Sequence, residues 1–122
     1  MMNRANADCW PRIHANGGDN PVIHGMFLRP LRKYGADDPS MQERSAILEE
    51  TLLLAAQSST GAKSLGIKFD IDQTGFGWSK LPVCTLEMGH ITNKTEDSRL
   101  VTESCKKRIV QGLTEGLIAY FQ

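Results

Sequence analysis

The segment from Asp38 to Gly61 constrains the fold more than any other part of the chain, because it has the features of one long helix. Asp38 suits the cap of the helix N-terminus, Pro39 suits its first position and Gly61 suits its end. Residues at three- and four-residue spacing form one stripe, Met41, Ser45, Leu48, Leu52, Ala55 and Ser59, which Ile47 and Leu54 widen. Glu43, Glu49 and Glu50 lie off this stripe. We therefore predict a helix over residues 39–60 that buries the stripe and exposes the three acidic side chains.

Strand-like patterns lie on both sides of this helix. Apolar stretches predict strands at residues 9–15, 22–28, 65–71 and 81–88, with a Gly-, Asn- and Pro-rich turn over 16–21 and a loop over 73–79. A second amphipathic pattern predicts one closing helix over residues 96–122, with Ile109, Leu113, Leu117 and Tyr120 on one face. Strands that alternate with helices indicate an α/β domain with a mostly parallel open sheet flanked by helices.

The composition argues against several classes of protein. Fourteen basic and fourteen acidic side chains cancel, so the chain lacks the basic surface typical of proteins that bind nucleic acids. No apolar run approaches the ~20 residues that span a bilayer, and residues 1–8 contain no apolar segment of the signal-peptide kind. The three cysteines are an odd number without a Cys-x-x-Cys motif. They indicate buried or idle thiols rather than a disulfide framework or a thiolate zinc site.

Two polar residues, His14 and Glu87, lie near the ends of predicted strands. In open α/β sheets, sites form beyond the carboxyl ends of the strands, so two residues far apart in the sequence can share one crevice. A histidine beside a carboxylate suits a metal site with a general base. Simpler interpretations also fit the pattern: a hydrogen-bonded structural histidine and a glutamate that caps a loop. We expect His24 to be a surface residue and His90 to be packed or at the rim.

Three stretches, in this order, resemble one family. Residues 12–25 (RIHANGGDNPVIHG) contain a strand ending in His-Ala-Asn, a loop and a strand opening with glycine. Residues 74–93 (TGFGWSKLPVCTLEMGHITN) contain a loop, a proline and a strand ending in Glu-x-Gly, and residues 96–121 match a closing helix. Together they resemble the zinc-dependent N-acetylmuramoyl-L-alanine amidases, of the autolysin and phage endolysin types. The resemblance implies that residues 1–122 are part of such a catalytic domain.

The resemblance also implies a function and a site. The reaction would be hydrolysis of the amide bond between N-acetylmuramic acid and the L-alanine of the stem peptide in peptidoglycan, with Zn²⁺ as cofactor and zinc-bound water as nucleophile. His14 is similar to a zinc ligand of the family. Glu87 is similar to its catalytic acid/base, which passes a proton to the leaving amine. The full-length parent would act outside the cell or in the cell wall.

The chain departs from the family pattern ahead of His14. The family's first zinc histidine, on a Gly-His-Gly-type loop, and a glutamate ligand have no counterpart there, although a catalytic zinc normally has three protein ligands. We therefore expect an N-terminally truncated domain with little activity alone, an uncovered apolar face and an unpaired sheet edge. The alternative is a non-catalytic remnant or peptidoglycan-binding module that lacks the complete zinc site. Pro11 stands at a strand position of the family, and proline belongs at sheet edges.

Overall fold

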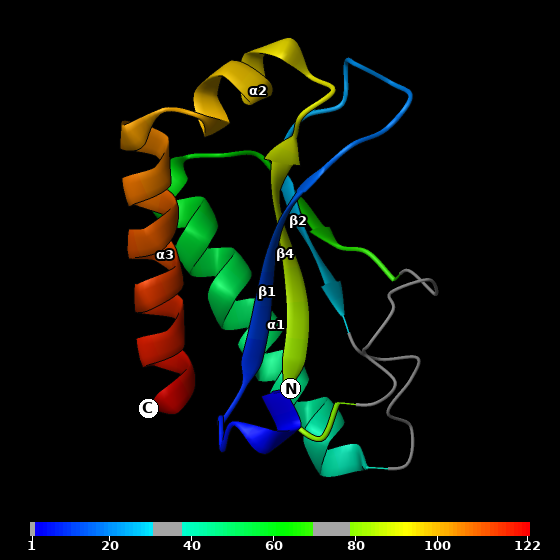
Figure 1. Ribbon diagram of the computed structural model, residues 1–122, viewed down its shortest axis with the longest axis vertical. Coiled ribbons are helices and arrows are strands. Elements are labelled where there is room, and N and C mark those ends of the chain that lie inside the picture. The colour runs from blue at the N-terminus through cyan, green and yellow to red at the C-terminus, as the bar shows by residue number, and fades with distance from the viewer. Residues whose placement is uncertain (1, 31–37, 70–78) are drawn as a thin grey trace.

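The structure is a computed structural model that describes residues 2–30, 38–69 and 79–122 (Figure 1). A short 3-10 turn, Met2–Arg4, precedes the first strand. The elements that follow are β1 (Trp10–Asn16), β2 (Met26–Pro30), α1 (Pro39–Thr60), β3 (Ser64–Ile67), β4 (Val83–His90), α2 (Lys94–Leu100) and α3 (Glu103–Phe121). Most of the predicted loop, residues 73–78, lies outside the described residues.

The four strands form one mixed sheet in the order β1-β4-β2-β3. β1 runs parallel to β4, and β2 runs parallel to β3. The third pairing, between β2 and β4, is antiparallel. The connection over residues 17–25 is too short to contain a crossover helix, so the chain reverses direction between β1 and β2. The predicted class, an α/β fold with a mostly parallel sheet, is confirmed, with one antiparallel pair that was not expected.

The helices α1 and α3 lie together on one side of the sheet, and α2 crosses near the end of β4 (Figure 1). The core between helices and sheet consists of Met26, Leu28, Leu48, Leu52, Leu53, Ala56, Ala62, Cys84 and Leu86. Cys84 and Leu86 of β4 face this core. Because side chains alternate along a strand, Thr85 and Glu87 face the opposite side of the sheet. This opposite side, on which Thr85 and Glu87 are buried, is called the second face below.

The helix α1 begins and ends where the sequence predicts. Oδ1 of Asp38 accepts hydrogen bonds from the N–H groups of Ser40 and Met41, and Gly61 ends the helix in the left-handed conformation. The predicted stripe is partly wrong. Glu49 is buried, whereas the side chains of Ile47 and Leu54, which were expected to widen the stripe, are exposed. The buried residues are Met41, Ser45, Leu48, Glu49, Leu52, Leu53 and Ala56, because α1 packs against α3 as well as against the sheet.

Two glycines allow α3 to approach α1 at backbone distance. A Cβ atom added at Gly112 would lie 2.7 Å from Cα of Ala56, and one added at Gly116 would lie 2.9 Å from the carbonyl oxygen of Thr51. Both glycines are buried. The interface between the two helices therefore has no room for a side chain at either position.

The single closing helix predicted over residues 96–122 is in fact two helices. Chain direction changes between Leu100 and Glu103, where Thr102 caps α3 by accepting a hydrogen bond from the N–H of Cys105. The preceding helix, α2, begins earlier than predicted because Asn93 accepts from the N–H of Glu96. Both helices therefore begin at a side-chain cap, and the cap at Thr102 interrupts what the sequence pattern predicts as one helix.

The strand predicted over residues 22–28 is shorter and starts later. Val22 and Ile23 lie in an exposed turn in which the side chain of Asn20 accepts from the N–H of Val22. Gly25 follows with a positive φ of 116°, which extended strands do not contain. The strand therefore begins at Met26.

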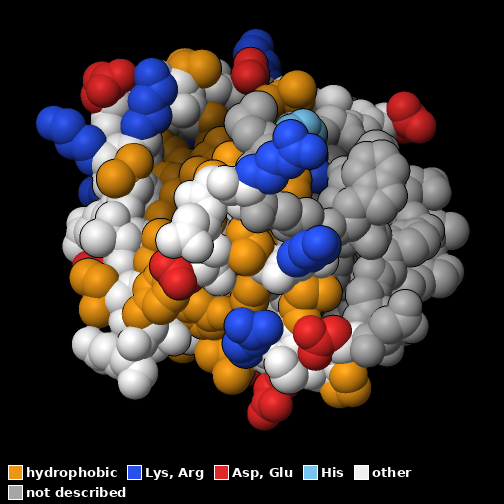
Figure 2. Space-filling view, turned by 60° about the horizontal axis from the view of Figure 1, so that its bottom comes forward, with side chains coloured by type: hydrophobic (Ala, Val, Ile, Leu, Met, Phe, Trp, Pro, Cys, Tyr) orange, Lys and Arg blue, Asp and Glu red, His pale blue; other side chains and the backbone are white. Residues whose placement is uncertain are grey.

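β1 is one of the two outer strands of the described sheet. Ile13 pairs with Leu86 on the helix side, and its side chain is 51% exposed. Apolar side chains of α3, including Val110 and Phe121, are exposed as well, and Figure 2 shows apolar side chains between α3, at the left, and the strands. Within the described residues, the expected uncovered apolar surface and unpaired strand edge are both present. Pro11 lies on this edge strand, as a proline in a sheet should.

The cysteines are free thiols, as the sequence predicts. Burial raises the pKa of Cys84 far above that of an ordinary thiol, which keeps it protonated and unreactive. The part of the chain that the structure describes contains no helix with the length and apolar character needed to cross a membrane.

Candidate active site

His14 and Glu87 meet on the second face of the sheet. They are directly opposite each other in the parallel pairing of β1 with β4. Nδ1 of His14 lies 2.8 Å from Oε2 of Glu87. Since a carboxylate only accepts hydrogen bonds, Nδ1 is the donor. The two residues therefore lie side by side as expected. Glu87, however, is inside β4, which continues to His90 rather than ending near Glu87.

The two partners differ sharply in exposure. The side chain of Glu87 is 2% exposed and that of His14 is 63% exposed. A carboxylate that loses its hydration in this way needs hydrogen-bond donors from the protein. His14 provides one donor and, because Nδ1 is occupied, keeps Nε2 for other contacts. The pair thus presents an oriented imidazole on the surface, supported by a buried carboxylate.

Sequence reasoning missed a third residue of the site, Arg29. Nε of Arg29 donates to Oε1 of Glu87 at 3.0 Å, and Nη2 donates to Oδ1 of Asn16 at 3.3 Å. Arg29 comes from β2, where Phe27 is the direct neighbour of Glu87. The guanidinium carbon lies 5.2 Å from the centroid of the Phe27 ring. In the sequence, Arg29 precedes Pro30 and marks only the end of a strand, so its role depends on the antiparallel pairing that the sequence does not show.

A second polar cluster surrounds Glu96 at the end of β4. Oε1 accepts from the N–H of Gly25 and from Nη2 of Arg99, and Oε2 accepts from the N–H of His90. His90 is 4% exposed, and its Nδ1 lies 3.1 Å from the carbonyl oxygen of Gly25. This network ties α2 to the ends of β2 and β4, so His90 is a packed residue, as expected.

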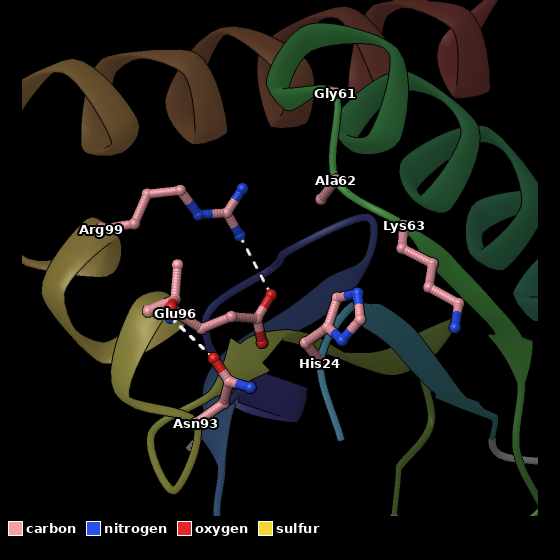
Figure 3. A pocket seen from close by; sticks show the side chains of 8 residues that line it. His24, Gly61, Ala62, Lys63, Asn93, Glu96 and Arg99 are labelled. Atoms are coloured by element: carbon pink, nitrogen blue, oxygen red, sulfur yellow. Dashed lines mark hydrogen bonds and ion pairs between the residues drawn. The ribbon is translucent and has the colours of Figure 1, made fainter. Parts of the chain in front are cut away.

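A hollow of about 490 Å³ lies beside this cluster, and Figure 3 shows the side chains that line it. Its lining residues are His24, Gly61, Ala62, Lys63, Asn93, Thr95, Glu96 and Arg99. Neither His14 nor Glu87 lines it. Both carboxylate oxygens of Glu96 are already engaged by Arg99 and by backbone N–H groups. The hollow is therefore separate from the candidate active site.

The described residues do not form a complete zinc site. Within residues 2–30, 38–69 and 79–122, no group of three or more His, Cys, Asp or Glu side chains could hold a metal ion. His14 and Glu87 supply one imidazole and one adjacent carboxylate, whereas a catalytic zinc needs three protein ligands and an open position. Further ligands would have to come from outside the described residues.

The fold is similar to that of several solved amidase structures. Similar solved structures include the catalytic domain of CwlV, an N-acetylmuramoyl-L-alanine amidase from Bacillus (Paenibacillus) polymyxa var. colistinus, with TM-score 0.83 and 21% identity. The amidase CwlD from Clostridioides difficile, solved in complex with the GerS lipoprotein, has TM-score 0.85 and 16% identity. The N-acetylmuramyl-L-alanine amidase Ami1 from Mycobacterium abscessus has TM-score 0.84 and 21% identity.

Each of these comparisons covers 98% of this chain, but only 61% of CwlV, 57% of CwlD and 57% of Ami1. Among curated proteins, none matches the sequence. The N-acetylmuramoyl-L-alanine amidase sequence profile matches residues 1–119. The chain belongs to the N-acetylmuramoyl-L-alanine amidase family, which confirms the resemblance seen in the sequence.

Proposed function

We propose that the protein hydrolyses the amide bond between N-acetylmuramic acid and L-alanine in bacterial peptidoglycan, and that it does so outside the cell or in the cell wall. The observation that carries this proposal is the contact of His14 with Glu87, 2.8 Å apart on the second face of the sheet in a chain that belongs to the amidase family. The comparisons support the fold and the family. The substrate bond and the residue roles are our inference.

Amide hydrolysis requires a group that removes a proton from the attacking water and delivers one to the leaving amine. We assign this role to Glu87, whose carboxylate is held by hydrogen bonds from His14 and Arg29. We assign His14 as a zinc ligand, because its exposed imidazole lies beside this carboxylate. Zinc, when bound, supplies a Lewis acid that polarises the scissile carbonyl and activates water. The remaining ligands would lie outside the described residues.

The test uses the longest natural polypeptide that contains this chain, incubated with purified peptidoglycan and zinc. We expect new α-amino groups of alanine to appear without new reducing sugar ends. His14→Ala should lower zinc affinity and alanine release together, because one of the few ligands is removed. His24→Ala is the matched control, since His24 is an exposed histidine outside the pair. Release of reducing ends instead of alanine amines would contradict the proposal.

One observation favours a second candidate function, a non-catalytic peptidoglycan-binding module. The described residues contain no group of three metal-ligating side chains. For the 122-residue chain by itself we therefore expect less than one zinc per molecule, measured by elemental analysis of the purified protein. Co-sedimentation with peptidoglycan in the absence of zinc would support the binding module. Stoichiometric, tightly held zinc would instead support the amidase.

A further inference from the structure

We propose that Arg29 is a positioning residue: it orients the Glu87 carboxylate and, through Glu87, sets the tautomer of His14. The functional meaning of this arrangement rests on the proposed function, because Glu87 and His14 have their roles there. The contacts of Arg29 with Glu87 and of Glu87 with His14 are made by protein side chains alone, without a metal or a substrate.

The two oxygens of the Glu87 carboxylate accept hydrogen bonds from two different side chains. Oε2 accepts from Nδ1 of His14 at 2.8 Å, and Oε1 accepts from Nε of Arg29 at 3.0 Å. The Glu87 side chain is 2% exposed and the Arg29 side chain 17% exposed. Within the part of the chain that the structure describes, these two side chains are the only ones that donate to Glu87. Without Arg29, one oxygen of a buried carboxylate would lose its donor, and the carboxylate would no longer be held in one orientation.

Arg29 is itself held by neighbouring residues. Its Nη2 donates to Oδ1 of Asn16, and its guanidinium packs over the ring of Phe27. Nζ of Lys68 lies 4.6 Å from the centroid of the same ring, so two cations contact Phe27. Asn16 belongs to β1 and Arg29 to β2, so the guanidinium connects the two strands that flank β4. Two nitrogens of one planar guanidinium point to different partners, an arrangement that a lysine ammonium does not reproduce.

The orientation of the Glu87 carboxylate affects the imidazole of His14. Which ring nitrogen of a histidine carries the proton is set by the hydrogen bond that the other nitrogen makes. A Glu87 carboxylate held toward Nδ1 keeps the proton there and leaves Nε2 with a free lone pair. Nε2 is then ready to act as a ligand or acceptor before any ligand arrives. Arg29 thus prepares the exposed imidazole from a distance, without contacting it in the described arrangement.

The test measures the tautomer of His14 directly in the metal-free protein, by long-range ¹H–¹⁵N NMR at a pH where the imidazole is neutral. In the wild type we expect the Nδ1–H form. Arg29→Met should shift His14 toward the Nε2–H form that a free imidazole prefers. Arg29→Lys should restore part of the Nδ1–H population through its charge. Arg12→Met is the matched control, because Arg12 and Arg29 flank Thr85 from opposite sides on the same face.

The outcomes separate a positioning role from a structural one. If Arg29→Met lowers the melting temperature but leaves the His14 tautomer unchanged, the inference is wrong. Should that variant fail to fold, Asn16→Ala decides, because it removes the acceptor of Nη2 and leaves Arg29 itself in place. A partial loss of the Nδ1–H form in Asn16→Ala supports the inference, and an unchanged spectrum overturns it. Zinc added to the same samples tests the proposed function separately. These zinc measurements use the longest natural polypeptide that contains the chain. A wild-type His14 that is in the Nδ1–H form there and binds no zinc contradicts only the metal role.

Discussion

Glu87→Gln is expected to lower the rate of alanine release from peptidoglycan by about 10²–10⁴-fold, the range typical of a lost general acid/base. Glutamine has nearly the same shape as glutamate, but it does not take up a proton at neutral pH. The experiment measures initial rates and thermal unfolding of the longest natural polypeptide that contains the chain. Glu50→Gln is the matched control, because Glu50 is an exposed carboxylate on α1.

The zinc content of the same samples determines the role of Glu87. If Glu87→Gln keeps its zinc and loses turnover, Glu87 moves the proton. If zinc and turnover are lost together, Glu87 acts as a ligand instead. Turnover at the wild-type rate would show that the proton is carried by another group.

Gly112→Ala is expected to lower the free energy of unfolding by about 2 kcal/mol, within the range for overpacking a core. The new Cβ would lie 2.7 Å from Cα of Ala56 and 2.9 Å from the carbonyl oxygen of Ala55. Both are backbone atoms, so α1 and α3 would have to separate. This cost is expected to exceed the gain of about 1 kcal/mol that alanine brings inside a helix. Since small domains have a total stability of about 5–15 kcal/mol, the change should be large in a urea unfolding curve.

The control for this prediction is Gly18→Ala. Gly18 has no atom within 4 Å of its added Cβ and lies in an exposed loop. The urea midpoint of the Gly18→Ala variant should therefore stay close to that of the wild type. Equal or greater stability of Gly112→Ala would mean that the two helices are less tightly packed than the structure shows.

Features of the fold that depend on local chemistry could be predicted from the sequence. Asp38, Pro39 and Gly61 define the ends of α1 through caps and backbone preferences that involve only neighbouring residues. The burial of Glu49 could not be predicted in this way. It depends on how α1 packs against the sheet, because Glu49 is close enough to Cys84 of β4 to raise the pKa of that thiol. The break at Thr102 had a local signal, a capping residue followed by Glu103, within an otherwise continuous apolar pattern.

Two of the three residues of the candidate site could be predicted from the sequence. His14 and Glu87 lie on strands that the apolar pattern identifies, and a parallel pairing of these strands places them together. Arg29 depends on the antiparallel pairing of β2 with β4, and this pairing is a long-range property of the sheet. The metal and catalytic roles of His14 and Glu87 stay predictions until the experiments above are done.

The position of Pro11 has a consequence for how copies of the protein behave in concentrated solution. The N–H of Trp10 donates to the carbonyl oxygen of Pro82, so alternate residues of β1 direct their N–H groups toward β4. The backbone nitrogens of the residues between them, Pro11, Ile13 and Ala15, therefore point away from β4. Pro11 has no N–H to donate there. An approaching strand meets one donor fewer than a regular edge would present. The missing donor makes this border of the sheet, which adjoins the imidazole of His14, a poorer template for pairing with a strand of another copy.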